Sequence, residues 1–373
     1  MSNGDRVSVM RADSETIPPP ESFIEQANVT DESIYEDWDA NWPECWERAA
    51  SFLDWTTEYD TVLDAEGPAF RWFSGGQLNA SYNCVDRHLS ERSTQDALHW
   101  EGVGGETRTY TYLDLYHAVN ECAAALRSLG VEEGDVVTLY LSMIPELPIA
   151  MLACARIGAP HNIVFADFSA DVLASRIERT DSAYLITADG YYRSADAIDL
   201  KSTADNARIT VDREVTVVVV DRLGSEPHLG QGYYSYDDLL AEHAGKEVEP
   251  VVRDASSPLF RIYTSGTTGE PKAVEHTTGG YLAHTAWTSH AVLDIKPEDT
   301  YWCAADISWI TGHSYVVYGP LALGTTSVMY EGLPERSGRD RVWDVIERNE
   351  VNTLYTSPTT VRTFMKRGSE RPA

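Results

Sequence analysis

A ten-residue stretch from Tyr263 to Lys272 carries the groups best suited to chemistry in this sequence. It reads Tyr-Thr-Ser-Gly-Thr-Thr-Gly-Glu-Pro-Lys and follows a strand-like run, Leu259 to Tyr263. Its two glycines allow the backbone to come close to an anion and turn N–H groups toward it. The Thr and Ser hydroxyls add donors and Lys272 adds a positive charge. The stretch therefore has the parts needed to hold a polyphosphate, and a hydroxyl-rich surface hairpin is the alternative.

The stretch is not a Walker A loop. A Walker A loop needs a Gly-Lys-Ser/Thr sequence that opens a helix. Here Pro271 lies between Gly269 and Lys272, and residues 273–276 favour an extended strand. The pattern instead resembles the phosphate-binding signature of the adenylate-forming superfamily, which includes acyl-CoA synthetases, luciferases and peptide-synthetase adenylation domains.

Other stretches narrow this resemblance to acetyl- and propionyl-CoA synthetases. It runs almost continuously from about Tyr35 to Met365. The stretches that carry it are Gly75 to Cys84, Met143 to Leu147, Met151 to Ala159, His276 to Tyr281 and Tyr301 to Gly332.

The resemblance implies an AMP-forming acetate–CoA ligase, or a ligase for another short-chain carboxylate. In such enzymes a carboxylate attacks the α-phosphorus of ATP to give an acyl-adenylate, and the CoA thiol then displaces AMP. ATP and CoA are expected as substrates, with Mg²⁺ as an aid to the first step, because backbone donors, Lys and Mg²⁺ stabilise the negative charge that gathers there. Thr267 and Lys272 are the candidates for catalysis. The residues expected to bind the ATP phosphates are Thr264, Ser265, Gly266, Thr267, Thr268, Gly269 and Lys272.

The resemblance also assigns an acyl pocket and a CoA site. Trp309, Ile310 and Thr311 match the segment that walls the acyl pocket, where an indole beside a β-branched residue leaves space for a short chain. Arg193 and Thr311 match positions associated with CoA, and a guanidinium could hold a phosphate with two hydrogen bonds. Core packing of Trp309 and a solvated Arg193 are the alternatives. Two departures bear on the CoA site: Ala195-Asp196 stands where a second basic residue is expected after Arg193, and Glu335 stands where an Asn is usual. Ala166-Asp167 also replaces a Gly-Gly pair after Phe165, and this change has no physical explanation in the sequence.

Alternating strand-like and helix-like stretches must position these residues. Val136 to Leu141 is an apolar strand-like run, and Pro145 to Ile157 has helical periodicity that Gly158 ends. Such βα alternation predicts parallel sheets covered by helices, an α/β architecture. Further predicted strands are 163–165, 184–187, 215–220, 326–330 and 351–355, and further predicted helices are 170–178, 236–243, 339–349 and 359–366.

The net charge of −30 is the most unusual bulk property. The 59 acidic residues outnumber 29 basic ones, of which only five are Lys. Such a chain repels itself in dilute buffer, whereas about 1 M salt screens charges beyond about 3 Å, so we expect a salt-rich cytoplasm. An acidic protein from an ordinary cytoplasm is the alternative. Nucleic acid is not an expected partner, because no basic patch is present. No membrane span and no metal site are expected, and the five Cys residues form no disulfide or metal-ligand pattern.

The predicted domain organisation has three parts. Residues 1–30 form a flexible acidic tail, 31–92 an aromatic-rich segment of the acetyl-CoA-synthetase type, and 93–373 an AMP-binding adenylation domain. The family continues beyond this point with nucleotide-binding segments and a small C-terminal domain, so the large domain is expected to be incomplete and the chain poorly active. A fragment of a ligase is preferred. One half of a split ligase, completed by a second chain, and a non-catalytic binding protein on the same scaffold are the alternatives.

Overall fold

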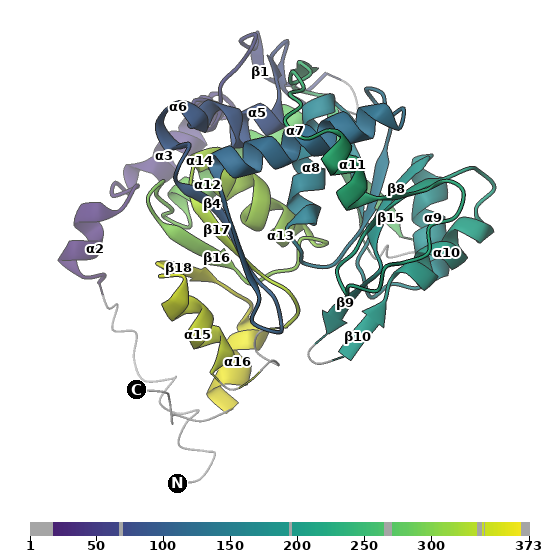
Figure 1. Cartoon of the computed structure of the whole chain (residues 1–373). Helices are drawn as coiled ribbons and strands as arrows, with labels where there is room; N and C mark the ends of the chain where they lie inside the picture. Colours follow the sequence, from purple (N-terminus) through teal and green to yellow (C-terminus); the bar gives the residue numbers. More distant parts are fainter. Residues whose placement is uncertain are drawn as a thin grey trace.

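Two twisted β-sheets with helices packed around them form the centre of the molecule (Figure 1). The computed structural model describes residues 18–66, 70–193, 196–264, 271–333, 338 and 340–366. In the larger sheet the strand order is β12-β11-β8-β6-β7-β14-β15, and in the smaller sheet it is β18-β16-β17-β4-β5. Both sheets are parallel except for one antiparallel strand at an edge, β15 in the larger and β5 in the smaller. The α/β architecture predicted from the sequence is confirmed.

The larger sheet has central strands that are apolar on both faces. All four residues of β6 are buried, and β11 has four consecutive Val residues that are all buried. Such strands need helices on both faces, which explains the alternation of strands and helices in the sequence. The strands are β6 (Val137–Tyr140), β7 (His161–Ile163), β8 (Tyr184–Ala188), β11 (Thr216–Val220), β12 (Tyr233–Ser235), β14 (Pro258–Thr264) and β15 (Lys272–Thr277). The accompanying helices are α7 (Tyr112–Ser128), α8 (Glu146–Ile157), α9 (Ala170–Thr180), α10 (Lys201–Thr210) and α11 (Tyr236–Glu242).

The smaller sheet buries large aromatic side chains. Trp100 on β4 and Trp302 on β16 are almost fully buried. On one side of this sheet α15 and α16 pack together, with the rings of Trp343 and Phe364 5.6 Å apart. The strands are β4 (Asp96–Glu101), β5 (Thr107–Thr111), β16 (Thr300–Cys303), β17 (Thr326–Tyr330) and β18 (Thr353–Tyr355). The helices are α12 (Thr278–Ala291), α13 (Ile310–Gly312), the π-helix η4 (His313–Tyr318), α14 (Gly319–Leu323), α15 (Arg341–Arg348) and α16 (Pro358–Lys366).

One predicted strand lies at a different position. The sequence predicts a strand at 163–165, whereas β7 spans His161–Ile163. The strand begins with two buried polar residues, His161 and Asn162, so a search for apolar runs does not detect its start. A turn in which the Phe168 N–H donates to the Phe165 carbonyl (2.9 Å) ends it. The other predicted strands and helices are present, with ends that differ by a few residues at most.

The aromatic-rich N-terminal segment lies over α12. Trp38 stacks on Trp287 of α12 with ring centroids 5.3 Å apart. Asn28 lies inside the predicted flexible tail, yet its side-chain amide donates to the carbonyls of His290 and Ile295 at 3.0 and 3.1 Å, so the structure anchors this residue. The elements of the segment are α2 (Glu21–Gln26), α3 (Ser33–Ala40), η2 (Glu44–Trp46), α4 (Glu47–Ala50), β1 (Thr61–Asp64), β2 (Arg71–Ser74), β3 (Gln77–Leu78), α5 (Ala80–Cys84), η3 (Asp86–His88) and α6 (Leu89–Arg92).

A short hairpin and a short pair of strands that lie far apart in the sequence complete the fold. The strand β9 (Gly190–Arg193) pairs with β10 (Asp196–Asp199) beside the larger sheet (Figure 1), and β13 (Arg253–Asp254) pairs with β3. Among the described residues, no helix has both the length and the apolar character needed to cross a membrane.

Candidate functional site

A pocket of about 520 Å³ opens where strands of both sheets end. Met143 follows β6, Phe165 follows β7, Asp306 follows β16, Gly332 follows β17 and Ser357 follows β18, and all five line the pocket. These strands are parallel within each sheet, so their carboxyl ends lie at one edge. Ligands of open α/β sheets bind in the crevice outside the carboxyl ends of the strands. The position of the pocket therefore marks it as the main candidate binding site.

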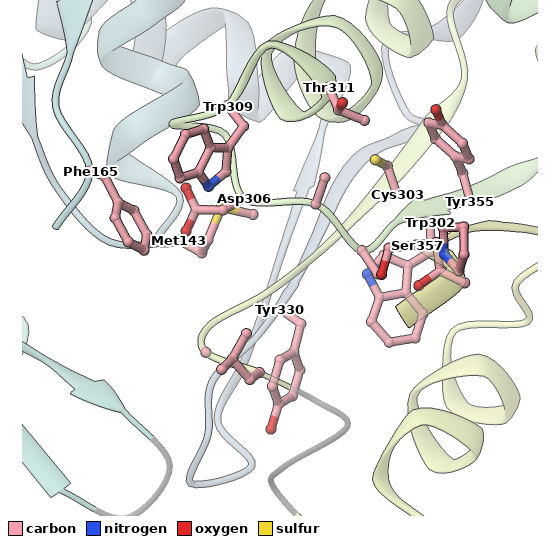
Figure 2. A pocket seen from close by; sticks show the side chains of 16 residues that line it. Met143, Phe165, Trp302, Cys303, Asp306, Trp309, Thr311, Tyr330, Tyr355 and Ser357 are labelled. Carbon is pink, nitrogen blue, oxygen red and sulfur yellow. The ribbon is translucent and has the colours of Figure 1, made fainter. Parts of the chain in front are cut away.

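Two of the three residues predicted for the acyl pocket line this cavity. Trp309 is half-exposed, and Figure 2 shows its indole beside Asp306 and Met143, with Phe165 to their left. The ring centroids of Trp309 and Phe165 are 5.7 Å apart. Thr311 also lines the cavity, whereas Ile310 does not and is 41% exposed. An indole, a phenyl ring and a threonine thus define one side of the pocket.

The turn that carries Trp309 is held by its own hydrogen bonds. The Asp306 carboxylate accepts from the Ser308 N–H (2.7 Å), and the Asp306 carbonyl accepts from the Trp309 N–H (3.1 Å). A Cβ at Gly312 would lie 2.1 Å from the Asp306 carbonyl oxygen, so this close approach needs a glycine. Burial raises the pKa of Asp306, the one carboxyl group among the described residues that line the pocket.

The helical segment behind this turn contains the π-helix η4. Short π segments within helices often occur at functional sites. His313, its first residue, is fully buried, with its ring 4.6 Å from that of Phe260 and 5.7 Å from that of His161. Burial lowers the pKa of His313 to about 4 and the pKa of His161 well below its ordinary value. Both imidazole rings are therefore neutral near pH 7 and serve as packing groups. His313 packs against Phe260 and contacts the Trp309 carbonyl.

The predicted phosphate loop joins two paired strands. Thr264 at the end of β14 lies opposite Lys272 at the start of β15 in an antiparallel pair. Ser265, Gly266, Thr267, Thr268 and Gly269, also predicted to bind phosphate, lie outside the described residues. The described part thus brings the two ends of the stretch together as a hairpin.

Acidic Glu275 on β15 has a basic partner. Its carboxylate accepts from Nε of Arg261 on the neighbouring strand, at 2.9 Å. A second guanidinium, that of Arg176 on α9, lies 4.1 Å from the ring of Tyr263, the residue before Thr264 on β14. The negative charge of Glu275 is therefore compensated locally, next to a site proposed for an anion.

The two residues predicted to contact CoA lie in separate places. Thr311 lines the pocket, but Arg193 lies at the end of β9 and is not a lining residue. The Arg193 guanidinium forms an ion pair with Asp167 (Nη1 to Oδ2, 2.6 Å). The Tyr191 hydroxyl donates to the other oxygen of Asp167. Arg193 is therefore paired with Asp167 while its side chain remains 48% exposed, and its contact with CoA stays a prediction.

Buried ion pairs hold the two sheets together beside the pocket. Arg222, which follows β11 of the larger sheet, donates to the fully buried carboxylate of Glu331, which follows β17 of the smaller sheet, at 2.6 and 3.0 Å. Arg222 also reaches Glu106 at 3.0 Å. Glu331 stands between Tyr330 and Gly332, which both line the pocket. This cluster fixes the spacing of the two sheets that form the pocket walls.

Several lining residues were not identified from the sequence as site residues. Met143 and Asp306 lie in stretches that carry the family resemblance, which was the available signal. Phe165, Tyr355 and Ser357 gave no signal, because their role depends on which strands end at the same edge. Among the described residues, no group of three or more His, Cys, Asp and Glu side chains could hold a metal ion.

Comparisons with known proteins cover nearly the whole chain. Residues 85–373 match the family described as AMP-binding enzyme, and residues 32–84 match the one described as acetyl-coenzyme A synthetase N-terminus. The chain is 46% identical to the acetyl-coenzyme A synthetase of Streptomyces avermitilis, over all of this chain and 57% of that protein. It is also 46% identical to that of Rubrobacter xylanophilus, over 96% of this chain and 56% of that protein.

A solved structure shares the fold. The acetoacetyl-CoA synthetase of Streptomyces lividans superposes with a TM-score of 0.85 at 27% identity, over 94% of this chain and 56% of that one. The chain thus spans somewhat more than half the length of the relatives it matches.

Proposed function

Because the chain belongs to the AMP-binding enzyme family and carries an N-terminal segment of the acetyl-coenzyme A synthetase type, we propose that it serves an AMP-forming ligase that joins acetate, or another short carboxylate, to CoA. The reaction would pass through an acyl-adenylate. ATP, CoA and the short acid are the proposed substrates.

The observation that carries this proposal is the pocket at the carboxyl ends of the strands. Trp309 and Thr311, which the family resemblance assigns to the acyl pocket, both line it. Its aromatic walls leave an apolar space, and Thr311 adds one hydroxyl that can orient a carboxylate or adenylate. A short acyl chain beside the Trp309 indole is the occupant that these groups favour.

The hairpin between Thr264 and Lys272 is the proposed site for the ATP phosphates. Lys272 would supply positive charge, and the loop between them would supply N–H and hydroxyl donors to the charge that develops on the phosphates. Mg²⁺ usually keeps several waters and binds through substrate phosphates with few protein ligands. The described residues fit that mode and not a metal cage built from side chains.

The 373 residues alone are proposed to turn over slowly. They span 57% of the Streptomyces avermitilis relative, so groups carried by the rest of that protein have no counterpart among the matched residues. The relatives hold the matched region and the rest in one polypeptide, which gives no support to a second chain as partner. We also propose a salt-rich cytoplasm as the setting, on the strength of the net charge of −30.

Trapping of the acyl-adenylate with hydroxylamine tests the proposal at the level of a single turnover. The purified chain, at high concentration with ATP and Mg²⁺, is expected to form hydroxamate from acetate or propionate and much less from hexanoate. Because one turnover is enough for detection, a slow enzyme still gives a signal. Absence of any carboxylate-dependent hydroxamate, or equal yields from all acids, would overturn the proposal.

A further inference from the structure

Asp167 occupies a rigid turn at the carboxyl end of β7, an interior strand of the larger sheet. The Phe168 N–H donates to the Phe165 carbonyl at 2.9 Å, which closes the turn. The buried Tyr140 hydroxyl lies 2.9 Å from the Ala166 carbonyl oxygen and 2.8 Å from that of Phe168. Since the residues on both sides of Asp167 are tied down, its carboxylate is presented at a fixed place.

Both oxygens of this carboxylate are engaged by the β9–β10 hairpin. The Tyr191 hydroxyl donates to one oxygen, and Arg193 Nη1 lies 2.6 Å from the other. The Asp167 side chain is 21% exposed and that of Arg193 is 48% exposed. A partly desolvated pair is screened less by salt than a fully exposed one. Asp167 therefore neutralises Arg193 where the guanidinium faces solvent.

The pair lies beside the candidate pocket. Phe165, two residues before Asp167, lines the pocket. Burial raises the pKa of Asp306, another lining residue, and the negative charge of Asp167 raises it further, which places Asp167 within electrostatic reach of the pocket. The arrangement bears directly on what can bind at this edge.

Within the described part of the β9–β10 hairpin, Arg193 is the one basic residue. Its cross-strand partner in the hairpin is Asp196, which is exposed. A phosphate that approached Arg193 would meet one guanidinium that is already paired, with a second carboxylate opposite it.

We propose that Asp167 is a specificity-determining residue, which competes with the phosphate groups of a phosphorylated thiol for Arg193 and so weakens the selection of CoA over an unphosphorylated thiol at this site. The proposal rests on the proposed function, because it takes CoA as the thiol. It gives a physical role to the Ala166-Asp167 pair, for which the sequence offers no explanation. Phosphate-containing ligands bind here only as far as they displace Asp167 from Arg193.

Binding of CoA and of pantetheine, which has no phosphate, tests the proposal. Dissociation constants are measured by calorimetry at the lowest KCl concentration at which circular dichroism shows the chain folded. Asp167→Asn keeps an oxygen for the Tyr191 hydroxyl and removes the charge. It is expected to tighten CoA about fivefold or more and to leave pantetheine unchanged. Asp171→Asn, which removes one charge from the exposed first turn of α9, is the matched control and should change neither.

A second substitution shows whether the gain passes through Arg193. Adding Arg193→Gln to Asp167→Asn is expected to abolish the gain in CoA affinity. An unchanged CoA affinity in Asp167→Asn, an equal gain for pantetheine, or a gain that survives Arg193→Gln would each overturn the proposal while the proposed function stands. Failure of all variants to bind either thiol would overturn both.

Discussion

The buried pair between Arg222 and Glu331 gives a prediction whose size follows from the structure. Arg222→Met keeps much of the side-chain volume but leaves the Glu331 carboxylate, which is fully buried, without its cation. Removal of one partner of a buried ion pair typically costs about 3–5 kcal/mol. The free energy of unfolding, measured with urea at fixed KCl near neutral pH, is expected to fall by roughly that amount.

An exposed ion pair supplies the control. Arg213 pairs with Asp181 at 2.7 Å, and the Asp181 side chain is 85% exposed. Arg213→Met should therefore cost about 1 kcal/mol or less. If Arg222→Met and Arg213→Met destabilised the chain equally, the claim that the Arg222 cluster holds the two sheets together would be refuted.

The pH dependence of the Arg222→Met variant follows from the remaining carboxyl group. Burial already raises the pKa of Glu331, and the loss of Arg222 removes a group that lowers it. A carboxyl group whose pKa is higher in the folded state than in the unfolded state stabilises the fold at a pH below its unfolded-state pKa. This stabilisation is lost as the pH rises through its folded-state pKa. The cost of the substitution should therefore be smaller at pH 5 than at pH 8. A cost independent of pH would show that Glu331 is not left charged and buried.

Four further outcomes are expected. Trp309→Ala should raise the hydroxamate yield with hexanoate relative to that with acetate by about tenfold. An unchanged ratio would show that the indole does not select between short and long acids. The folded-state pKa of His313, lowered by burial to about 4, lies below the unfolded value of 6.5, so the contribution of His313 to stability should fall by up to about 3 kcal/mol as pH drops from 6.5 to 4, and His313→Phe should make the pH dependence of stability less steep in this range. The urea midpoint should be higher in about 2 M than in 0.1 M KCl, and the reverse order would remove the argument for a salt-rich cytoplasm. Lys272→Ala should lower hydroxamate formation at least about tenfold, whereas exposed Lys246→Ala should not, and equal effects would argue against the phosphate hairpin.

The sequence predicted the fold well where the apolar positions in the sequence are also the buried positions in the structure. The Val-rich run of β11 and the periodic helix α8, which Gly158 ends with a φ of 75°, are present as predicted. β7 was misplaced because His161 and Asn162 are buried polar residues, and an apolar pattern does not detect such residues in a sheet.

The site was predicted only in part, and for a physical reason. Trp309 and Thr311 lie in the pocket as the resemblance implied, because a continuous motif carries them. Ser357 lines the same pocket because of the order of the strands, which no local pattern encodes. The pairing of Asp167 with Arg193 likewise depends on a turn and a hairpin that meet only in the folded chain.

A crystal structure of the chain with the propyl ester of AMP, a stable mimic of an acyl-adenylate, would show whether the pocket binds an acyl group. We expect the propyl group to contact the Trp309 indole and Thr311 in the pocket at the carboxyl ends of the strands. A ligand bound elsewhere, or a propyl group turned away from Trp309, would contradict it.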